Sequence, residues 1–378
     1  NSKRMLIREL FDENLNPKWN YIWTLEPFKA CIGVNQNKEW HREMLEEHIQ
    51  NVTMHMKDVI DGNCQEWLKR TRNHWDNLML MAAALCHDLG KASTTRWDDG
   101  LKQWKCKNHG AVGEKITRRL FFDEPDIHLR EGVCWLVRYH MGLHNVYDKK
   151  DDTEAVNAKV KTLSNSWKWV HPEDLAALYV CDCLGSSSVF NDNCGWKDNM
   201  TFAREYCTQC HNLPQPEKQE KQGLAVVLVG ISGSGKSTIA EEYKKEGFEV
   251  ISRDTIREEL GMTSSDKKFK GNKKQEDKVT ELFNERLLEF ACNKVPFVID
   301  NMNLIERYRK GYKELLKDYP LDWQCVYVEA PTLDDCKKRR EGQMPPGEID
   351  KMLDRLEFPR PHEFDGKIWL YKQCQSQC

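Results

Sequence analysis

Hydrophobic residues follow a helical pattern in the first half of the chain. They recur at three- and four-residue spacing, as in residues 78–85, 133–137 and 175–179, which is the spacing of amphipathic helices. Runs of β-branched residues are scarce before residue 214. This half is therefore predicted to be all-α.

The pattern changes after residue 223. Short apolar runs alternate with helical segments, and this order predicts an α/β domain with a parallel sheet. The strands are predicted at residues 224–229, 248–251, 295–299 and 324–329.

A polar segment separates the two patterns. Residues 214–223 have Pro at the start, Gly at the end and no apolar side chain, a composition typical of linkers. A chain of 378 residues is long enough for two cores. We therefore predict domains at residues 1–213 and 224–378, joined by a linker at 214–223.

The composition limits the binding partners and the cellular compartment that we expect for this chain. The net charge of −3 with 31% charged residues gives no overall basic field, so any nucleic-acid surface must be local. No apolar run reaches the ~18–20 residues that a membrane span needs. The odd number of cysteines, 15, and the lack of an apolar signal-like start favour reduced thiols and a cytoplasmic protein.

The most specific motif is the glycine-rich run 230–238, which follows the predicted strand 224–229 and opens a helix. Backbone N–H groups of such a loop bind phosphate oxygens at a helix N-terminus. Lys236 is expected to reach the outer phosphates of ATP or another nucleoside triphosphate, and Ser237 to bind Mg²⁺. The expected phosphate-loop residues are Gly230, Ser232, Gly233, Ser234, Gly235, Lys236, Ser237 and Thr238.

A second motif, Cys86-His87-Asp88-Leu89-Gly90-Lys91, ends an apolar helical segment. Adjacent imidazole and carboxylate groups can bind one divalent cation. Further residues of ligand type lie along the same helical half: His48, His109, His140 and Asp182.

This order of ligands over residues 40–190 resembles the HD-domain family of metal-dependent phosphohydrolases. The resemblance implies one or two divalent transition metals (Mn, Co, Ni, Zn or Fe), with Asp88 bridging them where two are bound. It also implies that Lys91 offsets phosphate charge. It assigns the first metal to His48, His87, Asp88 and Asp182, and the second to His109, His140 and Asp88. Whether His41 and His144 contact substrate or have surface roles stays open.

A cysteine cluster gives a weaker signal. Cys207, Cys210 and His211 formally match a haem-attachment run, or with Cys194 an irregular zinc site. Unliganded thiols are the interpretation we favour.

Polar residues follow the second predicted strand. In a parallel sheet, Asp254 should face the γ-phosphate, where it can accept a proton from a hydroxyl. Arg257 can bind an acceptor anion, although a surface ion pair with Asp254 is the alternative. Arg339 and Arg340 precede a loop suited to a lid over the phosphates. Asp300 ends the third predicted strand and is expected to lie over the same cleft. The alternative is that it is only a structural cap.

Residues 224–345 resemble the 5′-OH polynucleotide kinases. The resemblance implies that Lys236 and Ser237 bind ATP and Mg²⁺, that Asp254 is the general base and that Arg257 contacts the 3′ phosphate beside the 5′ end. The family often places its lid arginines about four residues apart, whereas here they are adjacent, so which of them acts is open.

The domain order resembles bacterial and phage HD-Pnk end-healing enzymes. It implies a bifunctional enzyme that acts on RNA or DNA ends before a separate ligase. Two alternatives remain: a small-molecule kinase fused to a nucleotidase, or an ATP-switched binding module. The basic run 267–274 could bind polynucleotide or be a solvated face. The tail 359–378 and the oligomeric state are not predicted.

Overall fold

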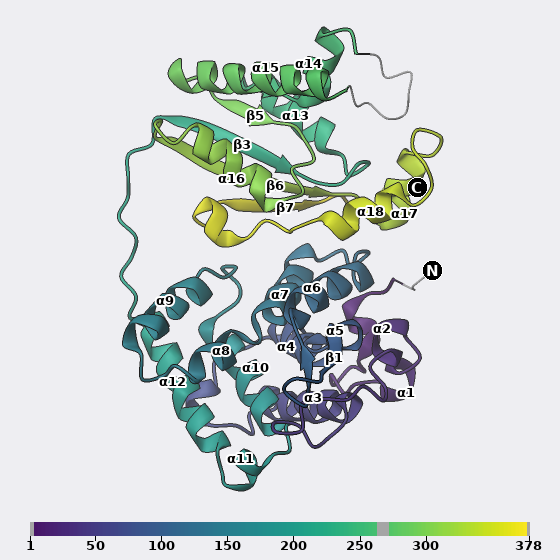
Figure 1. The fold of residues 1–378 in the computed structure, drawn as a ribbon, viewed down its shortest axis with the longest axis vertical. Helices are drawn as coiled ribbons and strands as arrows, with labels where there is room; N and C mark the ends of the chain where they lie inside the picture. Colours follow the sequence, from purple (N-terminus) through teal and green to yellow (C-terminus); the bar gives the residue numbers. More distant parts are fainter. Residues whose placement is uncertain (1–3, 263–271, 376–378) are drawn as a thin grey trace. The chain divides into compact units, whose positions relative to one another are not determined.

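A computed structural model describes residues 4–262 and 272–375 of the chain. It divides into two compact units, residues 1–215 and 216–378 (Figure 1). The division falls inside the polar segment 214–223.

The N-terminal unit is built from helices. Its central helix, α4, is apolar on nearly all sides, and residues 78–86 are all buried, as expected for a helix surrounded by others. Its main helices are α3 (Leu45–Ile60), α4 (His74–Cys86), α6 (His109–Leu120), α7 (Ile127–Tyr139), α9 (Thr153–Ser164), α10 (Pro172–Leu184) and α12 (Trp196–His211). Shorter ones are η1 (Ile7–Leu10), α1 (Trp19–Ile22), α2 (Glu26–Lys29), η2 (Glu66–Leu68), α5 (Lys91–Thr94), α8 (Gly142–Tyr147) and α11 (Val189–Asp192).

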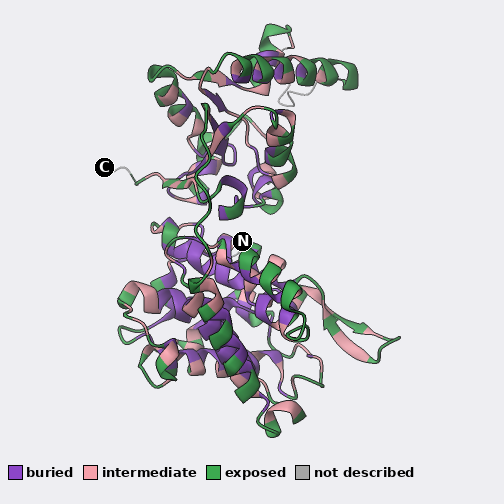
Figure 2. Cartoon of the chain, turned by 90° about the vertical axis from the view of Figure 1, so that its left-hand side faces the viewer, coloured by how far each residue is buried: buried purple, intermediate pink, exposed green. Residues whose placement is uncertain are grey.

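One element of this unit departs from the all-α prediction. Strands β1 (Thr95–Asp98) and β2 (Gln103–Cys106) form an antiparallel hairpin between α5 and α6. Its strands are four residues long and carry charged and amide side chains. They contain no apolar run from which the sequence would predict a strand. In Figure 2 the hairpin extends from the body of the unit and carries exposed and half-buried residues.

The C-terminal unit is an α/β domain, which confirms the predicted fold class. Its five strands are parallel and lie in the order β4-β5-β3-β6-β7. The strands are β3 (Gly223–Val229), β4 (Glu249–Ile251), β5 (Phe297–Ile299), β6 (Leu321–Glu329) and β7 (Ile368–Lys372). The helical elements are α13 (Lys236–Lys245), α14 (Arg253–Glu259), α15 (Lys273–Cys292), α16 (Glu306–Leu315), α17 (Leu333–Arg339), α18 (Glu348–Arg355) and η3 (Pro361–Phe364).

The core of the sheet explains the short apolar runs. Val226, Leu228, Val298 and Val328 form a buried cluster together with Ala240 of α13. Strands of a parallel sheet are covered on both faces, so they are apolar throughout rather than alternating. The chain tail supplies the edge strand β7, with Trp369 opposite Val326.

Two general findings complete the description. Among the described residues, no helix is both long enough and apolar enough to cross a bilayer. The cysteines in the described part of the chain are all free thiols.

Candidate active sites

The ends of five segments bring the predicted metal ligands of the N-terminal unit together. α3 carries one ligand in its first turn, the turn after α4 carries two, α6 begins with one, one follows α7, and one lies in the last turn of α10. All six side chains are buried: those of His48, His87, Asp88, His109, His140 and Asp182.

The first group surrounds one point in space. His48 Nε2 lies 2.8 Å from Asp182 Oδ1 and 3.3 Å from Asp88 Oδ2. His87 Nε2 lies 3.2 Å from the same Asp88 oxygen. One ligand atom from each of these four residues falls within 4.8 Å of the others, so the group could hold a single cation.

The second group uses the other oxygen of Asp88. Asp88 Oδ1 lies 3.4 Å from His109 Nε2 and 3.2 Å from His140 Nε2. These three residues again place their ligand atoms within 4.8 Å of one another. Asp88 therefore turns one oxygen to each group, which is the geometry of a bridging carboxylate.

The hydrogen bonds of the imidazoles orient them for metal binding. Each Nδ1 faces a backbone carbonyl, which can only accept, so Nδ1 carries the proton and Nε2 presents a lone pair. The carbonyl partners are Gly185 for His48, Ala84 for His87, Cys106 for His109 and Val137 for His140, at 2.7–3.2 Å.

These lone pairs point at one another. The Nε2 atoms of His109 and His140 are 3.0 Å apart, and those of His48 and His87 are 3.3 Å apart. Two unprotonated nitrogens cannot share a hydrogen bond, so these short contacts fit either a shared proton or a bound cation. Both Asp88 oxygens are buried and accept no hydrogen bond of good geometry from the described residues, which is a further sign of missing positive charge.

The pKa shifts of the histidines also indicate a site that favours cations. Burial opposes charge on these rings, yet the Asp88 carboxylate raises the pKa of His87 to about 9. For His109, burial is likewise outweighed by the Asp88 carboxylate 3.4 Å away, and its pKa rises to about 9. Burial lowers the pKa of His140 to about 4, with the nearby His109 acting in the same direction. The carboxylates thus create a negative potential that favours bound cations.

A close backbone contact holds the Asp88 turn in place. A Cβ atom on Gly90 would lie 2.0 Å from the carbonyl oxygen of His109 and 2.7 Å from the amide nitrogen of Gly113. Only glycine allows this turn to lie directly against α6, and this approach brings Asp88 within reach of both groups.

Lys91 lies beside the Asp88 carboxylate. Its Nζ is 3.0 Å from Asp88 Oδ2 and donates a hydrogen bond to Gln36 Oε1 at 3.0 Å. The amide of Gln36 donates in turn to the carbonyl of Glu43. The lysine is buried, so its charge acts on the metal centre rather than on solvent.

Sequence reasoning missed two residues of this site. The Glu43 carboxylate lies 2.9 Å from His41 Nδ1 and 3.2 Å from His48 Nδ1. Against the effect of burial, the neighbouring His109 ring lowers the pKa of the Cys106 thiol. Neither residue belongs to a motif; Glu43 is in a loop, and Cys106 ends the unpredicted hairpin.

The two histidines left open by the sequence both border the centre. His144 Nε2 lies 2.8 Å from Asp182 Oδ2. His41 reaches the centre through Glu43, and burial lowers its pKa to about 4. Their positions allow substrate contact.

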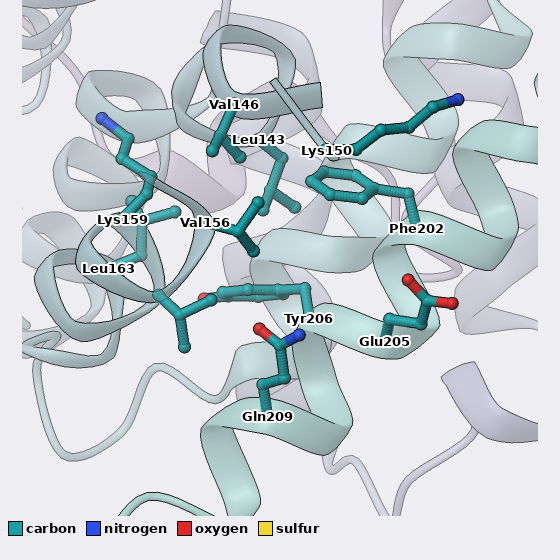
Figure 3. Close-up of a pocket in the computed structure, with 11 residues that line it drawn as sticks. Leu143, Val146, Lys150, Val156, Lys159, Leu163, Phe202, Glu205, Tyr206 and Gln209 are labelled. Atoms are coloured by element: carbon teal, nitrogen blue, oxygen red, sulfur yellow. The ribbon is translucent and has the colours of Figure 1, made fainter. Parts of the chain in front are cut away.

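A separate hollow of the N-terminal unit lies between α8, α9 and α12 (Figure 3). Val146, Val156, Leu163 and Phe202 are among its lining residues. Its volume of about 50 Å³ is small beside the roughly 300–1,000 Å³ of typical ligand sites, and it holds none of the predicted ligands.

In the C-terminal unit, the glycine run forms a tight loop between β3 and α13. Gly233 and Gly235 have φ of +82° and +102°, values that disfavour other residues. Lys236 Nζ donates to the carbonyl of Gly230 at 2.9 Å. Burial lowers its pKa to about 8, although Asp300 acts in the opposite direction. The exposed Ser237 and Thr238 begin α13.

The acidic residues follow neighbouring strands at the same edge of the sheet. Asp254 is in the first turn of α14, after β4, and Asp300 follows β5. Burial raises the pKa of Asp300; Lys236 opposes this effect and Asp254 adds to it. The three charges are therefore close enough to interact, as the parallel topology predicts.

Arg257 is bound to carboxylates rather than free. Its Nη1 lies 2.7 Å from Asp254 Oδ1, the ion pair that was the alternative interpretation, and its Nε lies 3.0 Å from Glu276 Oε1. Glu276, on α15, also pairs with Arg253 at 3.0 Å. Glu276 belongs to no sequence motif, and no local pattern predicts these contacts.

The two candidate lid arginines differ in their contacts. Arg339 donates to the carbonyl of Gly233 in the phosphate loop at 2.9 Å. Arg340 donates to Gln343 at 2.9 Å, and its charge contributes to the lowered pKa of Lys236. Both therefore border the loop.

Two weaker sequence signals have little structural support. Cys207 is buried and His211 bonds to Glu173. Neither belongs to a group of three or more candidate ligands within the described residues. Most of the basic run 267–274 lies outside the described residues, and its proposed role is not addressed by the structure.

Comparison with known proteins bears on both units. Residues 64–183 match the HD domain family model, and residues 226–359 match a family model described as an AAA domain. The chain therefore carries an HD domain followed by a P-loop kinase-like domain.

The curated relatives are distant. One is a bifunctional uridylyltransferase/uridylyl-removing enzyme of Ruegeria pomeroyi, 23% identical over 254 residues, covering 62% of this chain and 26% of the relative. A multifunctional CCA protein of Shewanella frigidimarina is 26% identical over 208 residues, covering 54% and 42%. The chain thus spans less than half the length of these two relatives.

Other matches have kinase names. An adenylyl-sulfate kinase of Clostridium acetobutylicum is 26% identical over 176 residues, covering 43% of this chain and 82% of that protein. Among solved structures, a gluconokinase from Sinorhizobium meliloti matches with a TM-score of 0.29 and 19% identity, covering 41% of this chain and 86% of that one. An APS kinase from Mycobacterium tuberculosis has a TM-score of 0.27 and 19% identity, covering 42% and 92%.

Proposed function

We propose that this chain heals the ends of broken RNA or DNA. Its P-loop domain transfers the γ-phosphate of ATP to a 5′-OH end, and its HD domain hydrolyses 2′,3′-cyclic, 2′ or 3′ phosphates. The observation that carries this proposal is the pairing, in one chain, of a complete two-cation ligand set with a phosphate loop that has an acid and an arginine beside it.

The HD centre suits an anionic phosphoester. Two divalent cations bound there would lower the pKa of a water and offset charge on phosphoryl oxygens. The ligands provide two carboxylates, from Asp88 and Asp182, and neutral imidazoles, so two such cations leave excess positive charge for the substrate. Lys91 adds a further cation beside Asp88, and His144 stands at the rim, where it can donate to a leaving oxygen.

The donor set also indicates which metals fit. Imidazole nitrogen is a better ligand for Mn, Fe, Co, Ni or Zn than for Mg²⁺, which prefers oxygen. The Ser237 hydroxyl and nearby carboxylates of the other domain are oxygen ligands that suit Mg²⁺.

In the kinase reaction, the 5′ oxygen attacks the γ-phosphorus as the bond to the bridging oxygen of ADP breaks. Asp254 accepts the hydroxyl proton, and ADP leaves with the bonding electron pair. Lys236 exchanges its contact with the Gly230 carbonyl for phosphate oxygens. Arg257 exchanges one carboxylate partner for the phosphate next to the 5′ end.

A second candidate rests on one specific observation. The adenylyl-sulfate kinase match covers 82% of that relative, which favours a small hydroxyl compound as the acceptor. In this case the HD domain would act on a metabolite phosphate.

A direct assay separates these candidates. The protein is given γ-labelled ATP with a 5′-OH oligonucleotide, free nucleosides or adenylyl sulfate in parallel. A second set contains an oligonucleotide with a 2′,3′-cyclic phosphate end and Mn²⁺. Label transferred only to the small molecules, with the cyclic end intact, would rule out end healing.

A further inference from the structure

The β1–β2 hairpin, which leads to the candidate ligand His109, carries a pair of tryptophans, of which Trp97 is exposed and Trp104 is half-buried. Trp97 and Trp104 lie directly opposite each other on the β1–β2 hairpin, with ring centroids 5.3 Å apart. Trp97 is 48% exposed. Large exposed aromatic side chains on a short projecting hairpin bury little area for the fold itself, and such surfaces commonly bind a partner.

The hairpin is connected to the metal centre at both ends. Its first strand follows α5, which begins at Lys91, and its second strand ends three residues before His109. The carbonyl of Cys106 accepts the Nδ1 hydrogen of His109 at 2.9 Å. Asn37, in the loop that leads to His41, donates to Gln103 at 3.2 Å.

The register fixes which face carries the tryptophans. Side chains alternate along a strand, so Trp97 and Trp104 share a face with Thr95 and Cys106. Cys106, the last residue on this face, contacts His109 through its backbone carbonyl, so the face ends beside a candidate metal ligand. Trp104 precedes Cys106 by two residues, or about 7 Å along the strand, and Trp97 lies opposite Trp104.

The charges of the hairpin favour a polyanion. Residues 95–108 contain four basic and two acidic side chains. Asp98 pairs with Lys105 at 3.3 Å and Asp99 with Lys102 at 2.6 Å. The excess is therefore positive. Exposed Lys107 follows Cys106 at the end of β2, where it can contact a phosphate. Exposed Arg96 lies on the opposite face of β1 and adds to the local positive charge.

We propose that the Trp97–Trp104 pair stacks on bases of a single nucleic-acid strand whose terminal phosphate occupies the metal centre. The proposal rests on the phosphoesterase function proposed above and names the element that distinguishes a strand from a mononucleotide. Aromatic platforms flanked by cations bind single strands without strong sequence preference.

The test compares two substrates with the same scissile group. The value of kcat/KM is measured for a 2′,3′-cyclic mononucleotide and for an oligonucleotide that ends in the same cyclic phosphate. For Trp97→Ala, the ratio of the oligonucleotide value to the mononucleotide value should fall about tenfold. Trp97→Phe should recover most of the ratio because it keeps an aromatic face.

Two controls separate stacking from damage to the fold. Trp369→Ala removes an indole that is 52% exposed on β7 and should leave the ratio unchanged. Trp97→Val keeps a side chain suited to a strand and should lower the ratio as Trp97→Ala does. An unchanged ratio in both Trp97 variants, or an equal fall for both substrates, would overturn the proposal.

The proposal can also be tested if the phosphoesterase function fails. Fluorescence anisotropy of a labelled oligo-dT then measures binding directly. The Trp97→Ala protein should bind it about tenfold more weakly than the parent protein. Equal affinity of the two proteins would refute the strand platform, whatever reaction the metal centre catalyses.

Discussion

The two sites of this chain differ in how far their side chains are already fixed. In the HD domain, Asp88 is 1% exposed and every candidate imidazole is oriented by a backbone carbonyl. In the P-loop domain, the Asp254 side chain is 76% exposed and Arg257 is shared between two carboxylates. A metal-binding site needs preorganised ligands. In a phosphoryl-transfer site, side chains can form ion pairs with one another until the substrates bind and replace these contacts.

The largest expected effect follows from breaking the preorganised site at its bridge. Asp88→Asn removes the carboxylate that faces both ligand groups, so metal content and phosphoesterase activity should fall to background. Kinase activity should be unchanged. Metal content is measured by plasma mass spectrometry on the purified protein, in parallel with both activity assays.

The matched control for this change is Asp192→Asn. Asp192 forms an exposed ion pair with Arg42 at 2.8 Å, and its loss should leave metal content intact. If Asp88→Asn kept its metals, or lost both activities while folded, the assignment of a bridging role and of separate sites would be wrong.

The next effect concerns the exposed acid of the other site. Asp254→Ala should lower 5′-OH phosphorylation about 10²–10⁴-fold, because no base accepts the hydroxyl proton. Phosphoesterase activity should be kept. Glu259→Gln, on the same helix and paired with Arg286, is the control and should retain kinase activity. If Asp254→Ala lost only a small part of its kinase activity, Asp254 would not be the general base, and its contact with Arg257 would be a surface ion pair only.

A smaller effect tests whether a second layer orients the metal ligands. Glu43→Ala frees Nδ1 of His48 from its carboxylate partner and should weaken binding of one cation about 10–100-fold. Competitive titration with a chelating dye measures this. Glu43→Gln keeps an oxygen acceptor and should recover part of the affinity, while the exposed Glu47→Ala should have none of this effect. If Glu43→Ala bound the cation as tightly as the parent protein, we would conclude that Glu43 orients His41 and not His48.

The smallest effect is a pH dependence of the P-loop site. With a pKa of about 8, Lys236 in the free protein is protonated below that pH and neutral above it. The kcat/KM for ATP should therefore fall roughly tenfold per pH unit above 8. The kcat at saturating ATP should stay level, because bound phosphates favour the charged lysine. A constant kcat/KM up to pH 9.5 would contradict the lowered pKa of this amine.

The sequence predicted the parts of the molecule that have strong local patterns. The runs at 224–229 and 324–329 became β3 and β6, since parallel strands are apolar on both faces. β7 was missed because the five residues of an edge strand alternate in burial and lie in an otherwise polar tail. The β1–β2 hairpin was missed because its side chains are mostly polar.

Among the site residues too, those in local motifs could be predicted and those without one could not. His87 and Asp88 are adjacent in a motif, and the other four candidate ligands fall at helix ends that the family order marks. Glu43 and Glu276 act only through contacts made by folding, Glu43 with His48 and Glu276 with Arg257 from 19 residues away. Such residues have no local signature, so the three-dimensional structure was needed to find them.

The most direct test of end healing uses one oligonucleotide with a 5′-OH at one end and a 2′,3′-cyclic phosphate at the other. It is incubated with the protein, ATP, Mg²⁺ and Mn²⁺, and its mass is followed. We expect a 5′ phosphate to be gained and the cyclic phosphate to be opened or removed, with Asp254→Ala blocking only the first change and Asp88→Asn only the second. An oligonucleotide that keeps both original ends, while ATP is consumed with a small-molecule acceptor, would contradict the proposed function.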